Sequence, residues 1–395
     1  MEKQALVYGA GNIGRGFVGQ LLYEGGYELA FIDVNKELIG LLNEKKEYPV
    51  KLVSNDSSRE VVIKNVRGID GSPENLGEVW DAISKAELMA TAVGVNILKF
   101  IMKPIADGIN KRFRDQNPVP LNIILCENMI GADKYMRAGI LEHIEDGFRD
   151  LYSEKIGIVE ASVGRMVPVQ TEEMKGGNPL RIVTEYYSKL YVDKDAFRGD
   201  IPEIENIVAY SPFEYYIERK LYIHNMAHAV CAYLGDIAGY EYVWQAIENP
   251  YIKEVAAGAM RYSGMALKSI YGEFDFGYID EVIARLANRA LGDTTNRVGL
   301  DLKRKLSPED RVAGVYRICA DNGLPVGFIC LVVAAAANFR GDKLSGQSLE
   351  DILKEAGSYE ILAKRPDDLA LVNKFDGAIK SGADVKKLYE MIEQP

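Results

Sequence analysis

The sequence contains few cysteines, and none of them are paired in a recognisable motif. Its 395 residues include four, Cys126, Cys231, Cys319 and Cys330, and no two form a CxxC pair. This scatter argues against a disulfide framework and against a cysteine-based zinc site. We therefore expect a reduced, cytoplasmic protein.

Long apolar runs and an excess of positive charge are also missing. The longest uninterrupted apolar stretch, 328–337, is too short to span a bilayer and indicates a buried helix. The net charge of −11 argues against a general nucleic-acid-binding protein or one held on anionic membranes. No charged-then-apolar leader opens the chain, so we expect no secretory signal. The remaining composition, 48% hydrophobic and 27% charged, is typical of a globular protein, and the length allows two domains.

The most informative stretch is Gly9-Ala10-Gly11-Asn12-Ile13-Gly14, which follows the strand-like run Ala5–Tyr8. Helical spacing follows it, and a second apolar run ends at Asp33, nineteen residues after Gly14. This order of strand, glycine turn, helix, strand and acid is typical of a dinucleotide-binding fold.

Each part of this motif has a physical role. Gly9 permits the tight turn, Gly11 lets the backbone approach a diphosphate, and Gly14 lets helix and strand pack closely. The helix N-terminus offers N–H groups and partial positive charge to the phosphates. Asp33 would accept hydrogen bonds from the ribose hydroxyls and repel a 2′-phosphate, which favours NAD over NADP. Alternatively Asp33 only caps a turn, and nearby Lys36 leaves some use of NADP open.

The chain changes character near residue 200. Before it, strand-like runs alternate with helical or polar segments, which predicts a parallel, doubly wound Rossmann-like sheet in residues 1–200. The expected strands are Ala5–Tyr8, Leu29–Asp33, Glu87–Val93, Leu121–Cys126, Lys155–Val163 and Leu180–Tyr187, with a small antiparallel insert of Val50–Val53 and Val61–Lys64. After it, helical spacing predicts a mostly α-helical domain over 201–395. The expected helices are Tyr215–Leu234, Tyr251–Ile270, Ile279–Leu291, a helix starting at Ser307, Leu324–Phe339, Leu349–Glu355 and Val385–Ile392.

A cluster of polar residues on the first of these helices is the densest candidate for catalysis. At 100° per residue, Lys220, His224 and His228 share one side of the helix, with Asn225 close by. Such groups suit a nicotinamide enzyme, which needs a base for the alcohol proton and donors for the developing alkoxide. Three other interpretations stay open: a zinc pair at His224 and His228, a short-chain-dehydrogenase YxxxK pair at Tyr216 and Lys220, and histidines that only pack in the core.

Several of these stretches resemble polyol-specific long-chain dehydrogenases, the mannitol dehydrogenase family. The resemblance spans nearly the whole chain, and its most specific part is the glycine motif together with Lys220, four residues, Asn225, two residues and His228. Its other stretches are 5–17, 91–94, 121–129, 218–221, 297–299, 304–307 and 310–311.

The resemblance implies an NAD-dependent enzyme that works without a metal, in the cleft between two domains. Lys220 matches the general base, Asn128 and Asn225 the amides that stabilise the alkoxide-like oxygen, and His228 a residue that orients the polyol. Ala92, Val93 and Gly94 match a strand end beside the cofactor, and Glu127 lies near the nicotinamide side. Mannitol 1-phosphate with fructose 6-phosphate is the favoured substrate pair, and family analogy favours a monomer.

The sequence allows more than one expectation for the substrate. The basic segment 285–305 could clamp a sugar phosphate or only form a solvated face; its candidate residues are Arg289, Arg297, Lys303, Arg304 and Lys305. Gly164 stands where the family carries an aspartate, Arg289 where it carries a proline, and His224 where it carries an apolar or small residue. The alternatives are a dehydrogenase of free polyols or hexuronates, such as mannitol 2-dehydrogenase or a fructuronate or tagaturonate reductase, and a cofactor-binding regulator without catalysis.

Overall fold

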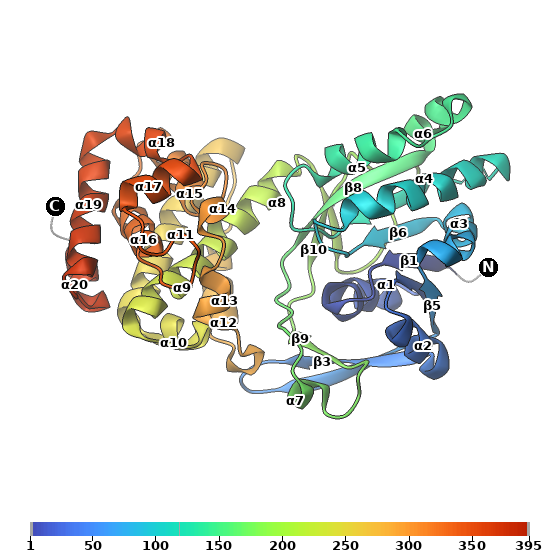
Figure 1. The fold of residues 1–395 in the computed structure, drawn as a ribbon, viewed down its shortest axis with the longest axis horizontal. Coiled ribbons are helices and arrows are strands. Elements are labelled where there is room, and N and C mark those ends of the chain that lie inside the picture. Colours follow the sequence, from blue (N-terminus) through green and yellow to red (C-terminus); the bar gives the residue numbers. More distant parts are fainter. Residues whose placement is uncertain (1–2, 118, 393–395) are drawn as a thin grey trace. The chain divides into compact units, whose positions relative to one another are not determined.

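The computed structural model describes residues 3–117 and 119–392. The chain forms two compact units, Met1–Ile217 and Glu218–Pro395, where the sequence places the division at residue 200. The division falls inside helix α8 (Glu214–Arg219) (Figure 1).

The first unit is built on an eight-stranded sheet in the order β11-β10-β8-β7-β6-β1-β2-β5. Its neighbouring strands are parallel except for β8 and β10, which are antiparallel. The strands of this sheet are β1 (Gln4–Tyr8), β2 (Glu28–Asp33), β5 (Val66–Asp70), β6 (Leu88–Thr91), β7 (Leu121–Leu125), β8 (Ile156–Val163), β10 (Leu190–Asp193) and β11 (Ile207–Tyr210). The predicted Rossmann-like α/β fold is thereby confirmed.

A second, smaller sheet has the order β4-β3-β9. Strands β3 (Glu47–Val53) and β4 (Ser58–Lys64) pair antiparallel, as predicted for the insert. The last predicted strand of the first domain, observed as β9 (Ile182–Glu185), adds to this sheet in parallel with β3.

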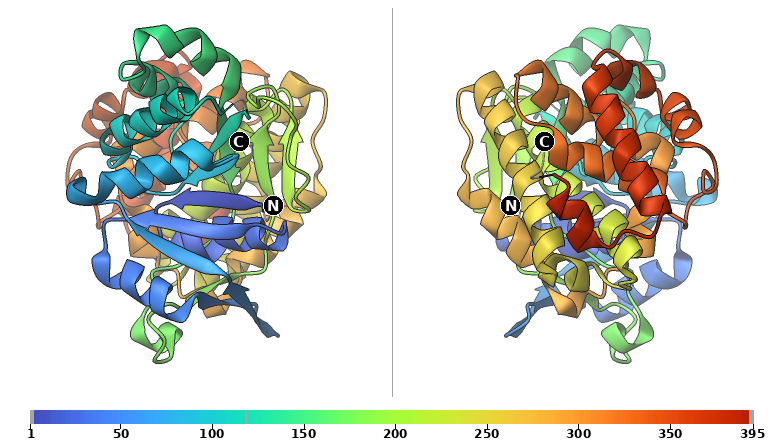
Figure 2. Two further views of the ribbon diagram at one scale, coloured as in Figure 1. Left: turned by 90° about the vertical axis from the view of Figure 1, so that its right-hand side faces the viewer. Right: turned by 90° about the vertical axis from the view of Figure 1, so that its left-hand side faces the viewer.

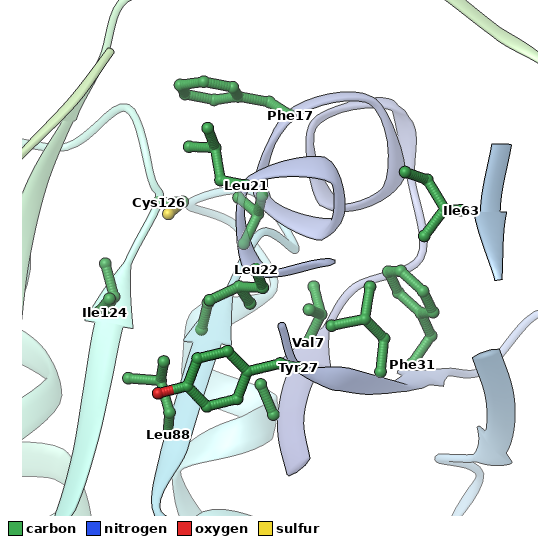
Figure 3. Packing of buried hydrophobic residues seen from close by; sticks show 14 of the residues in the cluster. Val7, Phe17, Leu21, Leu22, Tyr27, Phe31, Ile63, Leu88, Ile124 and Cys126 are labelled. Carbon is green, nitrogen blue, oxygen red and sulfur yellow. The ribbon is translucent and has the colours of Figure 1, made fainter. Parts of the chain in front are cut away.

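Helices cover both faces of the main sheet, so residues that alternate along a strand are buried on opposite faces. Val7 of β1 joins a cluster with Phe17, Leu21 and Leu22 on one face (Figure 3), whereas its neighbour Leu6 joins a cluster with the helices of the other face. The helices of this unit, besides α8, are η1 (Gly14–Val18), α1 (Gly19–Glu24), α2 (Lys36–Lys45), η2 (Pro73–Asn75), α3 (Leu76–Lys85), α4 (Leu98–Arg114), α5 (Ala132–Leu141), η3 (Asp146–Phe148), α6 (Arg149–Lys155) and α7 (Glu172–Lys175).

The second unit is helical, as predicted (Figure 2, right). Helix α9 is almost entirely buried and packs against α10, α11, α13 and α16. The segment 328–337 lies in the buried helix α16, as expected from its composition. The helices are η4 (Lys220–Asn225), α9 (Met226–Ala238), α10 (Val243–Glu248), α11 (Pro250–Tyr271), α12 (Gly277–Leu286), η5 (Arg289–Leu291), α13 (Thr295–Gly299), α14 (Leu302–Lys305), α15 (Ala313–Asp321), α16 (Gly327–Ala337), α17 (Leu349–Ala356), α18 (Tyr359–Ala363), α19 (Pro366–Lys380) and α20 (Val385–Glu390).

The predicted helix start at Ser307 is wrong, since 307–312 forms a turn and α15 begins at Ala313. The N–H of Val312 donates to the carbonyl of Lys305, and the carboxylate of Asp310 binds Arg304 and Arg311. These contacts hold the segment in a turn and delay the helix by six residues.

None of the helices in the described part of the chain combines the length and the apolar character needed to cross a membrane. The four cysteines are buried and free.

Candidate functional site

In the first unit, the glycine turn after β1 is built from backbone contacts that exclude side chains. Gly9 has a φ of 104°, and a Cβ there would meet the carbonyl oxygen of Ala92 at 2.4 Å. A Cβ on Gly14 would meet the carbonyl oxygen of Gly9 at 1.9 Å. Both glycines are therefore required by packing, as the motif predicts.

Gly11 differs from its two neighbours in the motif. It is exposed, and a Cβ placed there would find no atom within 4 Å. The open space lies at the start of a helix, where the first N–H groups have no intrahelical partner. This is the cradle that a dinucleotide diphosphate would fill, so the turn fits the predicted cofactor.

The helix that follows the turn contains a π-helical segment, η1, and is therefore not the regular α-helix expected from the sequence. Asn12 donates to the carbonyl of Pro168 over 3.4 Å, and Ile13 packs against the core, so these two residues offer a ligand mainly their backbone. Buried Arg15 donates to the carbonyls of Ala10 and Leu180 and thereby holds the backbone of the turn in place.

Asp33 stands at the end of β2, next to the glycine turn. One carboxylate oxygen accepts from the N–H of Ala10 at 2.8 Å, and the other accepts from Asn35 at 3.0 Å. The acid therefore caps the turn, and the same position keeps its negative charge beside the cradle. Lys36 lies 2.7 Å from Glu74 and 3.7 Å from Asp70, so a 2′-phosphate would compete with two carboxylates for this lysine.

Glu127 follows β7 and is hydrogen-bonded to the loop that follows the neighbouring strand β6. Its buried carboxylate accepts from the N–H groups of Val93 at 2.9 Å and Gly94 at 2.8 Å. Burial raises the pKa of Glu127, while these two hydrogen bonds oppose the rise. The structure thus gives Glu127 a part in holding the loop of Ala92, Val93 and Gly94, and the following Asn128 is exposed.

In the second unit, the predicted catalytic residues lie on or next to another π-helix. The segment Lys220–Asn225 is η4, and α9 continues from Met226. The prediction of one regular α-helix here is therefore wrong, and the 100° spacing overstates how closely the polar side chains align. Short π-helical segments often mark functional sites because they redirect side chains within a helix.

The surroundings of Lys220 favour its neutral form. Its pKa is lowered to about 8, mainly by burial and also by the charges of Arg311 and Arg304, while Asp310 opposes the shift. Arg311 and Arg304 both bind Asp310, with N–O distances of 2.8 and 2.9 Å. Lys220 therefore lies near an arginine–aspartate–arginine cluster. A lysine with such a pKa can act as a general base near neutral pH.

The surroundings of the neighbouring histidines favour their neutral forms. Burial and then Arg285 hold the pKa of His224 well below its usual value, and burial lowers the pKa of His228. Their ring centroids lie 6.1 Å apart, and Nε2 of His228 lies 3.0 Å from Asp293. In the alternative YxxxK pair of Tyr216 and Lys220, the ring of Tyr216 stacks on that of Tyr191, with the ring centroids 3.7 Å apart.

The residues predicted to bind a phosphate all have partners within the second unit. Arg289 binds Glu248 and lies over the ring of Trp244, and Arg297 binds Asp293. Lys303 is 3.8 Å from Glu355 and Arg304 binds Asp301, whereas buried Lys305 donates to the carbonyls of Val298 and Leu300. Phosphate binding by this segment stays a prediction.

Of the remaining departures, Gly164 lies against Tyr187, whose ring a Cβ would meet at 3.0 Å. Sequence reasoning missed Asp293, which the structure brings to His228 and Arg297. The available signal was its place four residues before Arg297, since a pair at that spacing meets on a helix-like turn. In residues 3–117 and 119–392, no group of three or more histidine, cysteine, aspartate or glutamate side chains could hold a metal ion.

A Rossmann-type unit with a GxGxxG turn, joined to a helical unit carrying a lysine of lowered pKa, defines the class as a two-domain dehydrogenase-type protein. Comparison with known proteins identifies the family. Residues 3–206 match the mannitol dehydrogenase Rossmann domain, and residues 213–390 match the mannitol dehydrogenase C-terminal domain. The chain belongs to the mannitol dehydrogenase family and is an enzyme, an oxidoreductase.

Similar proteins cover nearly all of the chain. Mannitol-1-phosphate 5-dehydrogenase of Bacillus licheniformis is 36% identical over 91% of this chain and 94% of its own length. The protein of that name in Brevibacillus brevis is 38% identical over 85% of this chain and 86% of its own. Among solved structures, Pseudomonas fluorescens mannitol 2-dehydrogenase in ternary complex with NAD and D-mannitol has a TM-score of 0.76 at 15% identity, covering 100% of this chain and 95% of that one. A D-sorbitol dehydrogenase has a TM-score of 0.83 at 15% identity, covering 98% and 95%. These two structures support the fold.

Proposed function

We propose that this enzyme interconverts D-mannitol 1-phosphate and D-fructose 6-phosphate, with NAD as the hydride carrier and without a metal. The observation that carries the chemistry is the pKa of Lys220, lowered to about 8; Lys220 begins the η4 segment that ends at Asn225, and His228 follows in α9. The phosphorylated substrate is favoured by the two relatives that are 36% and 38% identical to this chain over the matched residues.

In the oxidation direction, the neutral amine of Lys220 takes the hydroxyl proton of the polyol. The carbon–oxygen double bond forms as the hydride leaves the same carbon, and NAD, when bound, supplies the acceptor for that hydride. Asn128 and Asn225 donate hydrogen bonds to the oxygen as its negative charge develops, and His228 orients the substrate. The roles of these four residues are carried over from the family.

In the first unit, Gly9, Gly11, Asn12, Ile13 and Gly14 would hold the diphosphate by their backbone. Asp33 would bind the ribose hydroxyls, and Ala92, Val93 and Gly94, held by Glu127, would lie beside the cofactor. The glycine contacts and the open space at Gly11 support this assignment.

The substrate is tested by NADH consumption in the presence of a chelator, with fructose 6-phosphate, fructose and fructuronate measured in parallel. We expect turnover with fructose 6-phosphate only. Turnover with an unphosphorylated ketose alone would contradict the proposed substrate and assign Arg289, Arg297, Lys303, Arg304 and Lys305 to structure and solvent. Absence of turnover with all three ketoses, while NADH binds, would indicate another activity or a regulator.

The choice of cofactor is tested at Asp33. Asp33→Ala should weaken NADH binding about 10- to 100-fold, since hydrogen bonds to a charged group contribute roughly 1.5–3 kcal/mol, and should improve the use of NADPH. Asp33→Asn is the matched control, because it keeps an acceptor for the N–H of Ala10 and removes only the charge. If the parent enzyme already uses NADPH as well as NADH, this role of Asp33 is wrong.

A further inference from the structure

Asp293 lies next to two residues that are far from each other in the chain, His228 and Arg297. One of its oxygens lies 3.0 Å from Nε2 of His228, and Arg297 donates to its carboxylate through Nε at 2.7 Å and Nη2 at 2.6 Å. The side chains of His228 and Asp293 are both only 12% exposed. A buried carboxylate therefore stands between a histidine of α9 and an arginine of α13.

The backbone around Asp293 is firmly held. The N–H of Val243 donates to its carbonyl at 2.9 Å, and the next residue, Thr294, forms a β-bridge with Tyr242. The side chain of Thr294 also caps α13 by accepting from the N–H of Arg297. These contacts fix the main chain, and the two hydrogen bonds from Arg297 fix the direction of the carboxylate.

The charges favour one protonation state for each partner. Burial alone would raise the pKa of the Asp293 carboxyl, but His228 and Arg297 together hold it below its usual value. Burial lowers the pKa of His228, so the ring is neutral while Asp293 is ionised. A neutral imidazole beside a carboxylate carries its proton on the nitrogen that faces the carboxylate.

We propose that Asp293 is a positioning residue that fixes His228 with its proton on Nε2 and leaves Nδ1 to accept a hydrogen bond from a substrate hydroxyl. This inference rests on the proposed function, in which His228 orients the polyol. Arg297 is then the partner that keeps Asp293 ionised and correctly turned. A ring held in the wrong tautomer would offer the hydroxyl a donor in place of an acceptor.

The tautomer can be observed directly, because the chain has only three histidines. In protein labelled with ¹⁵N-histidine, the spectrum should show His228 as a neutral Nε2–H ring, assigned by its loss in His228→Gln. In Asp293→Asn, the remaining carbonyl oxygen is needed by Arg297, so the amide N–H should face His228 and move its proton to Nδ1. An Nδ1–H ring in the parent protein, or the same tautomer in both proteins, would overturn the proposal.

Turnover separates positioning from a general structural role. Asp293→Asn should lower kcat/KM for the ketose about 10- to 100-fold, as loss of an orienting partner does, while NADH binding is unchanged. In a His228→Ala background the same change should cost less than about threefold, because the two residues act as a unit. Equal losses in both backgrounds would show that Asp293 does not act through His228.

A matched control is available on α9, the helix that carries His228. Asp236 of α9 also pairs with an arginine, Arg340, and Asp236→Asn should leave kcat/KM and the tautomer of His228 unchanged. If the parent enzyme turns over none of the three ketoses, the proposed function fails, and the tautomer measurement still decides whether Asp293 fixes His228.

Discussion

Replacing Lys220 with alanine is expected to lower kcat about 10²- to 10⁴-fold, the usual contribution of a positioned general base. In the proposed reaction this amine takes the alcohol proton, and it lies on η4, the segment that also carries Asn225. NADH binding should stay nearly intact, because the glycine turn and Asp33 belong to the first unit. The measurement is NADH turnover together with NADH titration by fluorescence.

The pH dependence of the parent enzyme provides the independent check. A base must be neutral to accept a proton, and burial lowers the pKa of Lys220 to about 8. For polyol oxidation, kcat/KM should therefore rise with pH up to about 8 and level off above it. Ketose reduction needs the protonated amine, so its kcat/KM should fall as the pH rises through the same value.

Lys303→Ala is a suitable control, because Lys303 is an exposed lysine of the same unit whose nearest carboxylate is 3.8 Å away. Since Lys303 is itself a candidate for phosphate binding, the control is read from kcat at saturating ketose, which it should leave unchanged. Unchanged turnover in Lys220→Ala would remove Lys220 from the mechanism. If Lys220→Ala loses turnover but kcat/KM of the parent enzyme does not change with pH near 8, Lys220 is essential and its pKa is not the one that controls the rate.

Local patterns predict the first unit well, since each role in the motif depends on neighbouring residues. The turn from Gly9 to Gly14 and the acid at Asp33 lie where the sequence places them. The strand β5 escaped prediction because it begins one residue after β4, across Asn65 with a φ of 55°, so the two strands look like one run. Strands β10 and β11, of four residues each, were also missed.

The candidate site in the second unit was predictable in its residues but not in its geometry. The spacing of Lys220, Asn225 and His228 is visible in the sequence, whereas the π-helix η4 is not, because a period of 3.6 is assumed for any helix. Asp293 was missed for a different reason. It lies 65 residues from His228, and only the packing of α13 on α9 brings the two together.

The second large effect is expected in the glycine turn, where neighbouring glycines should fail in different ways. Gly14→Ala places a Cβ 1.9 Å from the carbonyl oxygen of Gly9, so the backbone must shift. We expect the free energy of unfolding to fall by about 3 kcal/mol, at the upper end of overpacking costs, with NADH binding lost as well. Gly11→Ala meets nothing within 4 Å and should leave stability within about 0.5 kcal/mol of the parent.

Gly11→Ala should nevertheless weaken NADH binding about 10- to 100-fold, because its methyl group occupies the space assigned to the diphosphate. Denaturant unfolding and NADH titration of both variants make the comparison. Gly40→Ala in α2 is the control, since Gly40 is exposed with nothing within 4 Å, and alanine in a helix should stabilise by up to about 1 kcal/mol. If Gly11→Ala binds NADH as tightly as the parent, the diphosphate lies elsewhere, and the open space at Gly11 has no part in cofactor binding.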